Sequence, residues 1–207
     1  SYIRFKGNDY SPDRMFDEIK GFVNENRDEE FFLMWTTTLP HAAFQAPDEM
    51  VDYYVKKFAD EYDVTETPVY NGKGYFPCRY PKATYAAMIT YFDQQIGKLI
   101  DELKRLGIYD NTIIMFTSDN GPTHNAYTST DWFECAAPFR SIKGWTKRSL
   151  HEGGIRVPFI VSWGDRLTPE VNDHIGFFPD VMPTLCDIAD VKCPETDGIS
   201  CLPRLAG

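Results

Sequence analysis

The sequence has no long hydrophobic run, no dense basic cluster and no export signal in its first residues. Its apolar stretches, such as residues 112–117, are far shorter than the roughly 18 residues that a membrane helix needs. The net charge is −10, from 31 acidic and 21 basic residues, and no run of Lys or Arg supplies the basic face of a nucleic-acid-binding protein. Residues 1–6 lack the apolar core of a signal peptide. We therefore expect neither a membrane span nor a nucleic-acid partner.

The cysteines form no Cys-x-x-Cys pair, and their spacing is not that of a zinc site. Because there are five of them, at least one thiol is unpaired within the chain, and the redox compartment stays open. No repeat or low-complexity segment interrupts the 207 residues, of which 43% are hydrophobic and 25% charged. That length and composition are those of one substantial globular domain, or of a large part of a bigger one.

Apolar periodicity predicts alternating helices and strands. A helix is expected to begin at Ser11-Pro12-Asp13, since a cap, a proline and an early acid favour the first turn. A long second helix has apolar residues on one face from Tyr85 to Leu103, and Gly107 is placed to end it. The remaining expectations are a buried strand at 31–35, an irregular loop at 63–82, apolar strands at 112–117 and 157–163 covered on both faces, and a last helix at 179–190.

The alternation of helices with fully apolar strands predicts an α/β fold with helices on both faces of the sheet. In such sheets, ligands bind on the loops at the carboxyl ends of the strands. The loops to consider follow residues 37, 117 and 163, and the first two contain polar side chains suited to chemistry.

Asp119 and Asn120 directly follow the strand predicted at 112–117. Their carboxylate and amide oxygens are of the ligand type that Ca²⁺ and Mg²⁺ prefer. The string Asp-Asn-Gly-Pro at 119–122 is also favourable turn chemistry, and by itself it favours a turn over a metal site. The two residues are therefore candidate metal ligands that need support from elsewhere in the chain.

Two further segments contain side chains that suit an anion. His41 follows the first predicted strand and can donate a hydrogen bond to a substrate oxygen, although a lone loop histidine is more often solvated. Residues 146–158 place Lys147, Arg148 and Arg156 around a double glycine, and any of the three cations could hold an anion. The glycines allow a tight turn or a close approach to neighbouring backbone.

Taken in order, these segments resemble the type I sulfatases of the alkaline phosphatase superfamily. The resemblance is carried by an apolar run at 31–33 with Pro-His at 40–41 and Gln-Ala-Pro at 45–47, by Phe-Thr-Ser-Asp-Asn-Gly at 116–121, by Lys147 five residues before Glu-Gly-Gly-Ile-Arg-Val-Pro at 152–158, and by closing segments at 180–189 and 197–200. It covers nearly the whole chain. Its most specific element is the Glu-Gly-Gly-Ile-Arg-Val-Pro string in register with a strand-end Asp-Asn-Gly.

The resemblance implies an alkaline-phosphatase-like α/β/α sandwich of three layers, incomplete in this chain, and the hydrolysis of sulfate esters. It implies that Asp119 and Asn120 match two ligands of a divalent cation, usually Ca²⁺. His41 and Lys147 match the residues that contact the sulfate and stabilise the leaving oxygen, so they are the candidate catalytic and substrate-binding residues. A metal and a lysine would offset the repulsion between an anionic substrate and a chain of net charge −10.

Several parts of the family pattern are missing. The family's nucleophile is a cysteine in Cys-x-Pro-Ser-Arg or Cys-x-Ala-x-Arg that is oxidised to formylglycine, and none of the five cysteines fits; Cys78 has a nearby proline and cations at the wrong spacing. The paired aspartates that complete the metal site and a Lys-x-x-x-His segment are also missing. His124 receives no role, because the segment after Gly121 has one residue more than the commoner Pro-His. Lys143 is a rival for the sulfate contact, and Lys147 is favoured for its spacing to the Glu-Gly-Gly string.

These departures lead us to expect that residues 1–207 are the carboxyl-side part of a single sulfatase catalytic domain, without its amino-terminal half or its small carboxyl-terminal domain, and inactive alone. The alternatives are a non-catalytic binder of sulfated glycans and a phosphodiesterase or phosphonate hydrolase of the same superfamily. The substrate is open between small sulfate esters and sulfated glycans, and residues 63–82 and 123–135 are the candidates to line its pocket. By resemblance, we expect a periplasmic, secreted or lysosomal protein; the oligomeric state is open.

Overall fold

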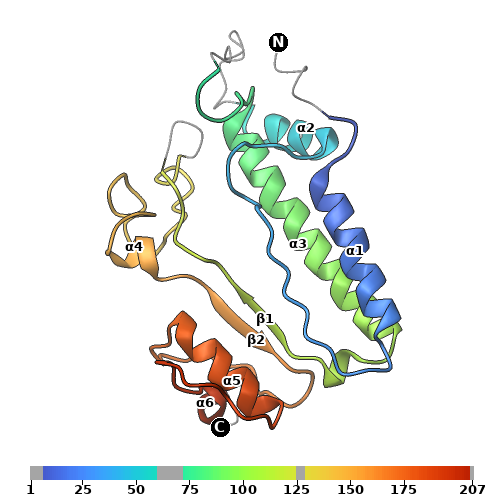
Figure 1. The fold of residues 1–207 in the computed structure, drawn as a ribbon. Helices are drawn as coiled ribbons and strands as arrows, with labels where there is room; N and C mark the ends of the chain where they lie inside the picture. The colour runs from blue at the N-terminus through green and yellow to red at the C-terminus, as the bar shows by residue number, and fades with distance from the viewer. Residues whose placement is uncertain (1–6, 60–71, 125–128, 206–207) are drawn as a thin grey trace. The chain divides into compact units, whose positions relative to one another are not determined.

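The computed structural model of the chain describes residues 7–59, 72–124 and 129–205 (Figure 1). Its contacts divide the chain into two units, one comprising Ser1–Ile108 with Met115–Ile160 and the other Tyr109–Ile114 with Val161–Gly207. The elements are α1 (Ser11–Glu25), α2 (Asp48–Lys57), α3 (Pro81–Arg105), the 3-10 turn η3 (Tyr109–Asn111), β1 (Ile114–Thr117), α4 (Glu152–Ile155), β2 (Phe159–Ser162), the 3-10 turn η4 (Phe178–Asp180), α5 (Val181–Ile188) and α6 (Leu202–Leu205).

Helix α1 lies where the sequence predicts it, because a proline stands in its first turn and apolar side chains recur with helical spacing. It ends at Asn26, whose backbone N–H and side-chain amide both donate to the Phe22 carbonyl (3.0 and 2.8 Å). These bonds satisfy a carbonyl that has no partner inside the helix. The side chains that the helix buries are Pro12, Phe16, Ile19 and Val23.

Helix α3 extends over 25 residues and ends as predicted at Gly107, which has a φ of +74° that favours glycine. The Ile108 N–H donates to the Leu103 carbonyl (3.1 Å) and the Gly107 N–H to the Lys104 carbonyl (3.0 Å), which is the pattern of a Schellman end. Both α1 and α2 pack against α3 (Figure 1). None of the helices in the described ranges is long and apolar enough to cross a membrane.

The segment at 31–35 is not the buried strand that its apolar run predicts; it is extended but is not part of a sheet. Burial alternates along it, since the Trp35 ring packs edge-on against Phe92 of α3 (centroids 5.2 Å apart) while Phe32 and Met34 are 68% and 73% exposed. A strand needs a hydrogen-bonded neighbour, and among the described residues β1 and β2 form the only sheet. One face of the apolar run is therefore covered by α3, and the other face is exposed.

Strands β1 and β2 confirm the two later predictions of strands, with tighter bounds. The chain leaves β1 toward the loop at residue 118 and returns along β2, so the end of β1 and the start of β2 lie at one edge of the sheet (Figure 1). Helix α3 covers β1, since the rings of Phe92 and Phe116 lie 6.1 Å apart. The expectation that both strands are covered on both faces is wrong for β2, where Phe159 and Ile160 are exposed. The α/β class is as predicted, and its layers are incomplete in the described residues.

A hydrophobic core cluster of the first unit lies where α3 begins. It brings together a residue that follows the extended segment, one from the irregular loop and two from α3. Of the loop predicted at 63–82, residues 63–71 lie outside the described ranges, residues 72–80 are irregular as expected, and Pro81 already belongs to α3. The cluster consists of Phe44, Cys78, Tyr85 and Met88.

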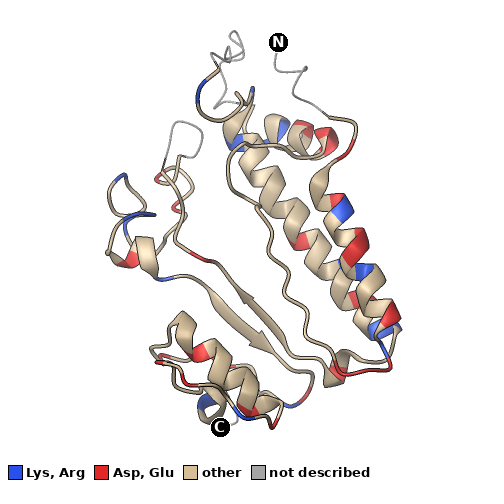
Figure 2. Cartoon of the chain, in the orientation of Figure 1, with Lys and Arg blue, Asp and Glu red and all other residues tan. Residues whose placement is uncertain are grey.

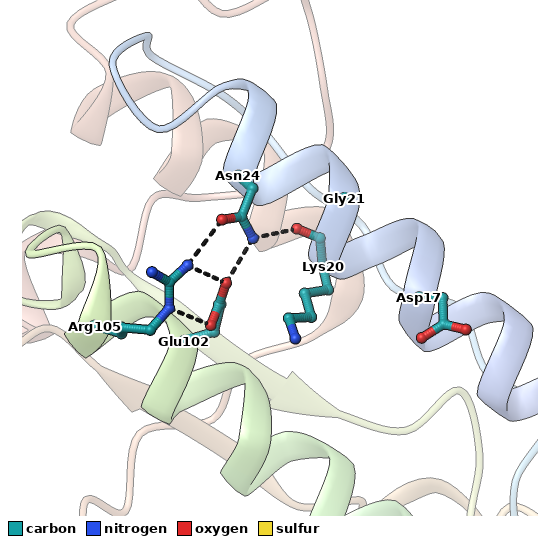
Figure 3. A pocket seen from close by; sticks show the side chains of 6 residues that line it. All are labelled: Asp17, Lys20, Gly21, Asn24, Glu102 and Arg105. Atoms are coloured by element: carbon teal, nitrogen blue, oxygen red, sulfur yellow. Dashed lines mark hydrogen bonds and ion pairs between the residues drawn. The ribbon is translucent and has the colours of Figure 1, made fainter.

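A polar network around Glu102 joins α1 to α3 (Figure 3). Arg105 donates to both carboxylate oxygens (2.8 and 2.7 Å), and Asn24 donates to one of them (2.6 Å). The hydrogen bonds from Arg105 first and from Asn24 second lower the pKa of Glu102 from 4.5 to about 2. The shallow pocket beside the network has two acidic and two basic side chains, so it selects neither sign of charge and is structural. Its lining is Asp17, Lys20, Gly21, Asn24, Glu102 and Arg105.

In the second unit, α5 is the last helix that the sequence predicts, and it is held by Asp180 and Thr184. The Asp180 carboxylate accepts hydrogen bonds from the N–H groups of Ile199 (2.7 Å) and Phe177 (3.0 Å), and these bonds lower its pKa. The buried Thr184 hydroxyl donates to the Asp180 carbonyl (2.6 Å) and accepts from the Cys201 N–H (2.8 Å). Both side chains thus tie the helix to the segment that follows it.

Candidate active site

The loop after β1 presents Asp119 and Asn120 at the edge of the sheet. Asp119 is exposed and Asn120 half-buried. The Ser118 hydroxyl donates to the Asn120 carbonyl (3.0 Å), and the Asn120 side-chain amide donates to the Gly121 carbonyl (2.9 Å). The bond from its nitrogen orients the Asn120 amide and leaves the amide oxygen available as a ligand.

Two backbone hydrogen bonds join this loop to the segment before β2. The Gly121 N–H donates to the Gly154 carbonyl (2.9 Å), and the Lys147 N–H donates to the Pro122 carbonyl (2.8 Å). Lys147 is half-buried, whereas its rival Lys143 is exposed. The structure therefore brings the backbone of Lys147 to the loop that contains Asp119 and Asn120.

The contact between the two segments is close because it is built from glycines. A Cβ on Gly121 would lie 2.1 Å from the Gly153 carbonyl oxygen, and a Cβ on Gly154 would lie 2.4 Å from the Ser149 carbonyl oxygen. Real Cβ atoms essentially never come so near to backbone, so these positions require glycine. The close approach expected of the double glycine is confirmed.

The segment around α4 is rich in Lys and Arg (Figure 2), and two of its cations are held by neighbours. Arg156 forms an ion pair with Glu152 (3.1 Å) and lies over the Phe139 ring (5.1 Å). Arg140 lies over the Trp145 ring (4.5 Å). Of the anion-holding candidates in the sequence, Arg156 thus has a structural partner.

His41 is exposed, and its described side-chain contacts are with Ala42 and Tyr75. Its Nδ1 lies 2.5 Å from the Ala42 carbonyl oxygen, and its ring packs edge-on against Tyr75 (centroids 5.5 Å apart). Since a carbonyl oxygen only accepts, Nδ1 carries the hydrogen and Nε2 is left for another partner. These contacts do not join His41 to Asp119 or Lys147.

His124 and Cys78 have structural partners, in keeping with the absence of a predicted role. His124 Nδ1 lies 2.7 Å from the hydroxyl of the buried Thr130. The Cys78 thiol donates to the Thr84 hydroxyl (3.1 Å), and burial raises its pKa, which keeps the thiol protonated. The disfavoured cysteine is thus a core residue.

Sequence reasoning missed one polar feature, the contact of Lys82 with Trp132. The ammonium of Lys82 lies 4.4 Å from the centroid of the Trp132 ring. The two residues are far apart in the chain, so no local pattern predicts their contact. The only available signal was the aromatic and polar composition of residues 123–135.

Asp119 and Asn120 fit a divalent cation only as part of a ligand set. Within the described ranges, no three His, Cys, Asp or Glu side chains are grouped so that they could hold a metal ion. Ca²⁺ takes about six to eight oxygen ligands, of which one carboxylate and one amide oxygen supply a minority. The donor chemistry is suitable, and the number of donors is too small for this pair alone.

Comparison with known proteins identifies the family. The family model described as Sulfatase matches residues 2–191. The chain is 33% identical over 155 residues to a choline-sulfatase of Rhizobium meliloti (strain 1021), covering 70% of this chain and 24% of the relative. It is 28% identical over 201 residues to an uncharacterised sulfatase, YdeN, of Escherichia coli (strain K12), covering 95% of this chain and 31% of the relative. The chain thus spans about a quarter to a third of the length of these curated relatives.

Solved structures show the same relationship. The structure of Ps i-CgsB superposes with a TM-score of 0.68 at 27% identity, covering 97% of this chain and 39% of the neighbour. A structure of Ps i-CgsB in complex with k-i-k-neocarrahexaose gives a TM-score of 0.64 at 26% identity, with 96% and 39% covered. These neighbours confirm the alkaline-phosphatase-like α/β fold, of which this chain holds an incomplete part. With the family model matching all but the ends of the sequence, the chain belongs to the sulfatase family.

Proposed function

We propose that these 207 residues are the carboxyl-side part of the catalytic domain of a sulfatase that hydrolyses sulfate esters. The observation that supports this most is the pair of backbone hydrogen bonds from Gly121 to Gly154 and from Lys147 to Pro122. They tie the strand-end Asp-Asn loop and the candidate lysine together at one edge of the sheet, where ligands of α/β proteins bind.

In this proposal, Lys147 and His41 act on the sulfate group. The ammonium of Lys147 neutralises the negative charge that develops on the transferring group and on the leaving oxygen. Its N–H bond to Pro122 anchors the backbone, so the side chain starts from a defined position at the loop that contains Asp119. His41 donates a hydrogen bond from Nε2 when its ring is protonated, since Nδ1 is already engaged with Ala42.

Asp119 and Asn120 are proposed to contribute the carboxylate and the amide oxygen to a divalent cation, for which Ca²⁺ is the expected ion. A cation there neutralises charge on the sulfate oxygens. Because the pair supplies a minority of the ligands that Ca²⁺ takes, we expect the 207 residues alone to bind the ion weakly.

The substrate class that we favour is a sulfated glycan, with a small sulfate ester as the alternative. The glycan is supported by the structure of Ps i-CgsB in complex with a hexasaccharide. The small ester is supported by the name of the choline-sulfatase relative. A sulfated glycan would also suit a secreted, periplasmic or lysosomal protein, the locations expected from the resemblance.

The 207 residues should not release sulfate from an arylsulfate by themselves. None of the five cysteines stands in a Cys-x-Pro-Ser-Arg or Cys-x-Ala-x-Arg pattern, so the chain has no residue that would become formylglycine. Sulfate release by this chain alone would contradict the proposal that the nucleophile of the site is not among these 207 residues.

The test of the roles is made in a protein in which these residues follow a sulfatase amino-terminal segment that carries the formylglycine motif. Lys147→Ala should lower kcat for 4-nitrophenyl sulfate about 10²–10³-fold, the loss typical of one charge-stabilising donor. Lys143→Ala, a matched loss of an exposed lysine, should change kcat by less than about twofold. Full activity in Lys147→Ala, with circular dichroism unchanged in both variants, would refute the role assigned to Lys147. Cleavage of a phosphodiester in preference to the sulfate ester would favour the phosphodiesterase alternative.

A further inference from the structure

Trp132 lies on the surface of the first unit and is 38% exposed. Tryptophan is enriched at binding surfaces, because its ring offers a large apolar face together with a polar N–H. The ring is held on two sides, since Phe58 (centroids 5.1 Å, 77°) and Phe133 (4.5 Å, 84°) meet it edge-on. Phe133 in turn packs against Tyr85 of the buried cluster (5.2 Å). The exposed indole is therefore fixed in place.

Lysines accompany the aromatic rings of this surface. Lys82, half-buried at the start of α3, places its ammonium 4.4 Å from the Trp132 centroid. On α2, Lys57 lies 5.8 Å from the centroid of Tyr53, whose side chain is 59% exposed. We name these four residues (Trp132, Lys82, Tyr53 and Lys57) the Trp132 platform.

The platform is continuous, because ring contacts run from α2 to the Trp132 loop. Tyr53 meets Tyr54 (5.0 Å), Tyr54 meets Phe58 (5.4 Å), and Phe58 meets Trp132. Figure 2 shows Lys and Arg at the end of α2 and at the start of α3, although the chain as a whole is acidic. The acidic neighbour Asp131 lies 4.0 Å from His124 Nδ1.

The platform is connected to the candidate active site through one short segment. Thr130, two residues before Trp132, is buried and donates to the Ser141 carbonyl. The Ser141 hydroxyl accepts from the Ala136 N–H (2.9 Å), and the Ala136 side chain lies next to Gly153. Gly153 belongs to the same glycine contact that holds the Asp119 loop, so the segment that contains Trp132 packs against the segment that holds this loop.

We propose that the Trp132 platform binds a sulfated pyranose residue of an oligosaccharide, with Trp132 stacking on the sugar ring and Lys82 pairing with a sulfate. The C–H face of a pyranose carries slight positive charge and matches the negative face of an indole. An ammonium that already lies beside that ring can pair with a sulfate on the same sugar with little further loss of side-chain conformational entropy. This inference rests on the proposed function, since it assigns a glycan to the sulfatase site, and it concerns binding alone.

The test is a titration of the 207-residue chain with sulfated hexasaccharides of chondroitin, carrageenan and heparin type, each beside its desulfated counterpart. Binding is measured by calorimetry and by tryptophan fluorescence. At least one sulfated hexasaccharide should bind more tightly than its desulfated counterpart. Lys82→Gln should weaken that sulfated ligand about tenfold, the effect of one lost charge-assisted hydrogen bond, and leave the desulfated one unchanged. Trp132→Phe, which keeps an aromatic ring and should fold, should remove most of the fluorescence change and weaken both ligands about threefold.

Lys98→Gln is the matched control, because it removes an exposed lysine of α3 that is not part of the platform. It should leave the affinity within about twofold. No binding by any of the sulfated hexasaccharides, or binding that Lys82→Gln and Trp132→Phe do not weaken, would overturn the proposal. Failure of the proposed function looks different: the glycan binds here, yet the protein that carries the formylglycine motif releases no sulfate from any ester.

Discussion

Gly121→Ala tests whether the glycine contact assembles the candidate site. The new Cβ would lie 2.1 Å from the Gly153 carbonyl oxygen and 3.0 Å from the Gly154 Cα, and both of these are backbone atoms that no rotamer change can move. Gly97→Ala is the matched control, since a Cβ there meets no heavy atom within 4 Å and Gly97 lies inside α3.

The expected cost follows from the geometry. Reaching the ordinary contact distance of 3.4 Å from 2.1 Å requires a movement of 1.3 Å, the difference of the two, by one of the segments. Overpacking of this kind costs about 1–3 kcal/mol, and loss of the Gly121 N–H bond to Gly154 costs about 1 kcal/mol more. The sum is about 2–4 kcal/mol, whereas Gly97→Ala should stabilise the chain by about 0.5–1 kcal/mol because alanine favours helix.

Amide hydrogen exchange measures the effect where it arises. In Gly121→Ala, the amides at positions 121 and 147 should exchange at least about 30-fold faster, the factor that corresponds to 2 kcal/mol. The same amides should keep their protection in Gly97→Ala. If both amides stay protected in Gly121→Ala, and the thermal midpoint matches wild type, the close contact does not hold the Asp119 loop against Lys147.

Two further substitutions test the networks of the separate units. The Glu102 carboxylate contributes stability above its ordinary pKa of 4.5 and loses that contribution as the pH falls toward about 2, so the difference in unfolding free energy between wild type and Glu102→Gln should narrow over that range. Glu18→Gln, at an exposed position of α1, is the control and should show no such narrowing. A Glu102→Gln difference that stays constant in urea unfolding from about pH 6 to about pH 2 would count against the Arg105 pairing. Thr184→Val keeps the shape of the side chain and removes a hydroxyl that both donates and accepts a hydrogen bond. It should lower the free energy of unfolding by about 1–3 kcal/mol, measured by thermal unfolding, and the Cys201 amide should exchange faster. Unchanged protection of that amide would rule out the role given to the hydroxyl.

Elements with local signals could be predicted from the sequence. Helix α1 has its proline at the start and its apolar side chains three and four residues apart, and α3 has a glycine in the left-handed conformation at its end. These signals act within a few residues, so they do not depend on what the rest of the chain supplies. Helix α2 was not predicted, although its partly buried residues Met50, Val51, Tyr54 and Val55 recur with helical spacing and the helix packs against α3.

The segment at 31–35 shows where such reasoning fails. An apolar run predicts which side chains need cover, but it does not say whether the covering element and the neighbouring strand lie within the same 207 residues. Here α3 covers the face of Trp35, and the face of Phe32 and Met34 is exposed in the described part of the chain. The same reasoning explains the exposure of Phe159 and Ile160 on β2. The apolar strands predict a sheet that is covered on both faces, and the described residues contain only two strands of it.

In the candidate site too, the sequence predicts the residues that belong to a motif and misses the contacts that depend on tertiary packing. Spacing to the Glu-Gly-Gly string favoured Lys147 over Lys143, and a backbone bond to Pro122 supplies a physical reason for that preference, because it anchors one lysine and leaves the other in solvent. In the described residues, the His41 side chain contacts Ala42 and Tyr75, and its place beside the sulfate stays a prediction. Lys82 and Trp132 lie 4.4 Å apart without any shared motif. Their contact arises from tertiary packing, so it becomes visible only in the fold, whereas the candidate metal-ligand pair at the end of a strand could be named from the sequence.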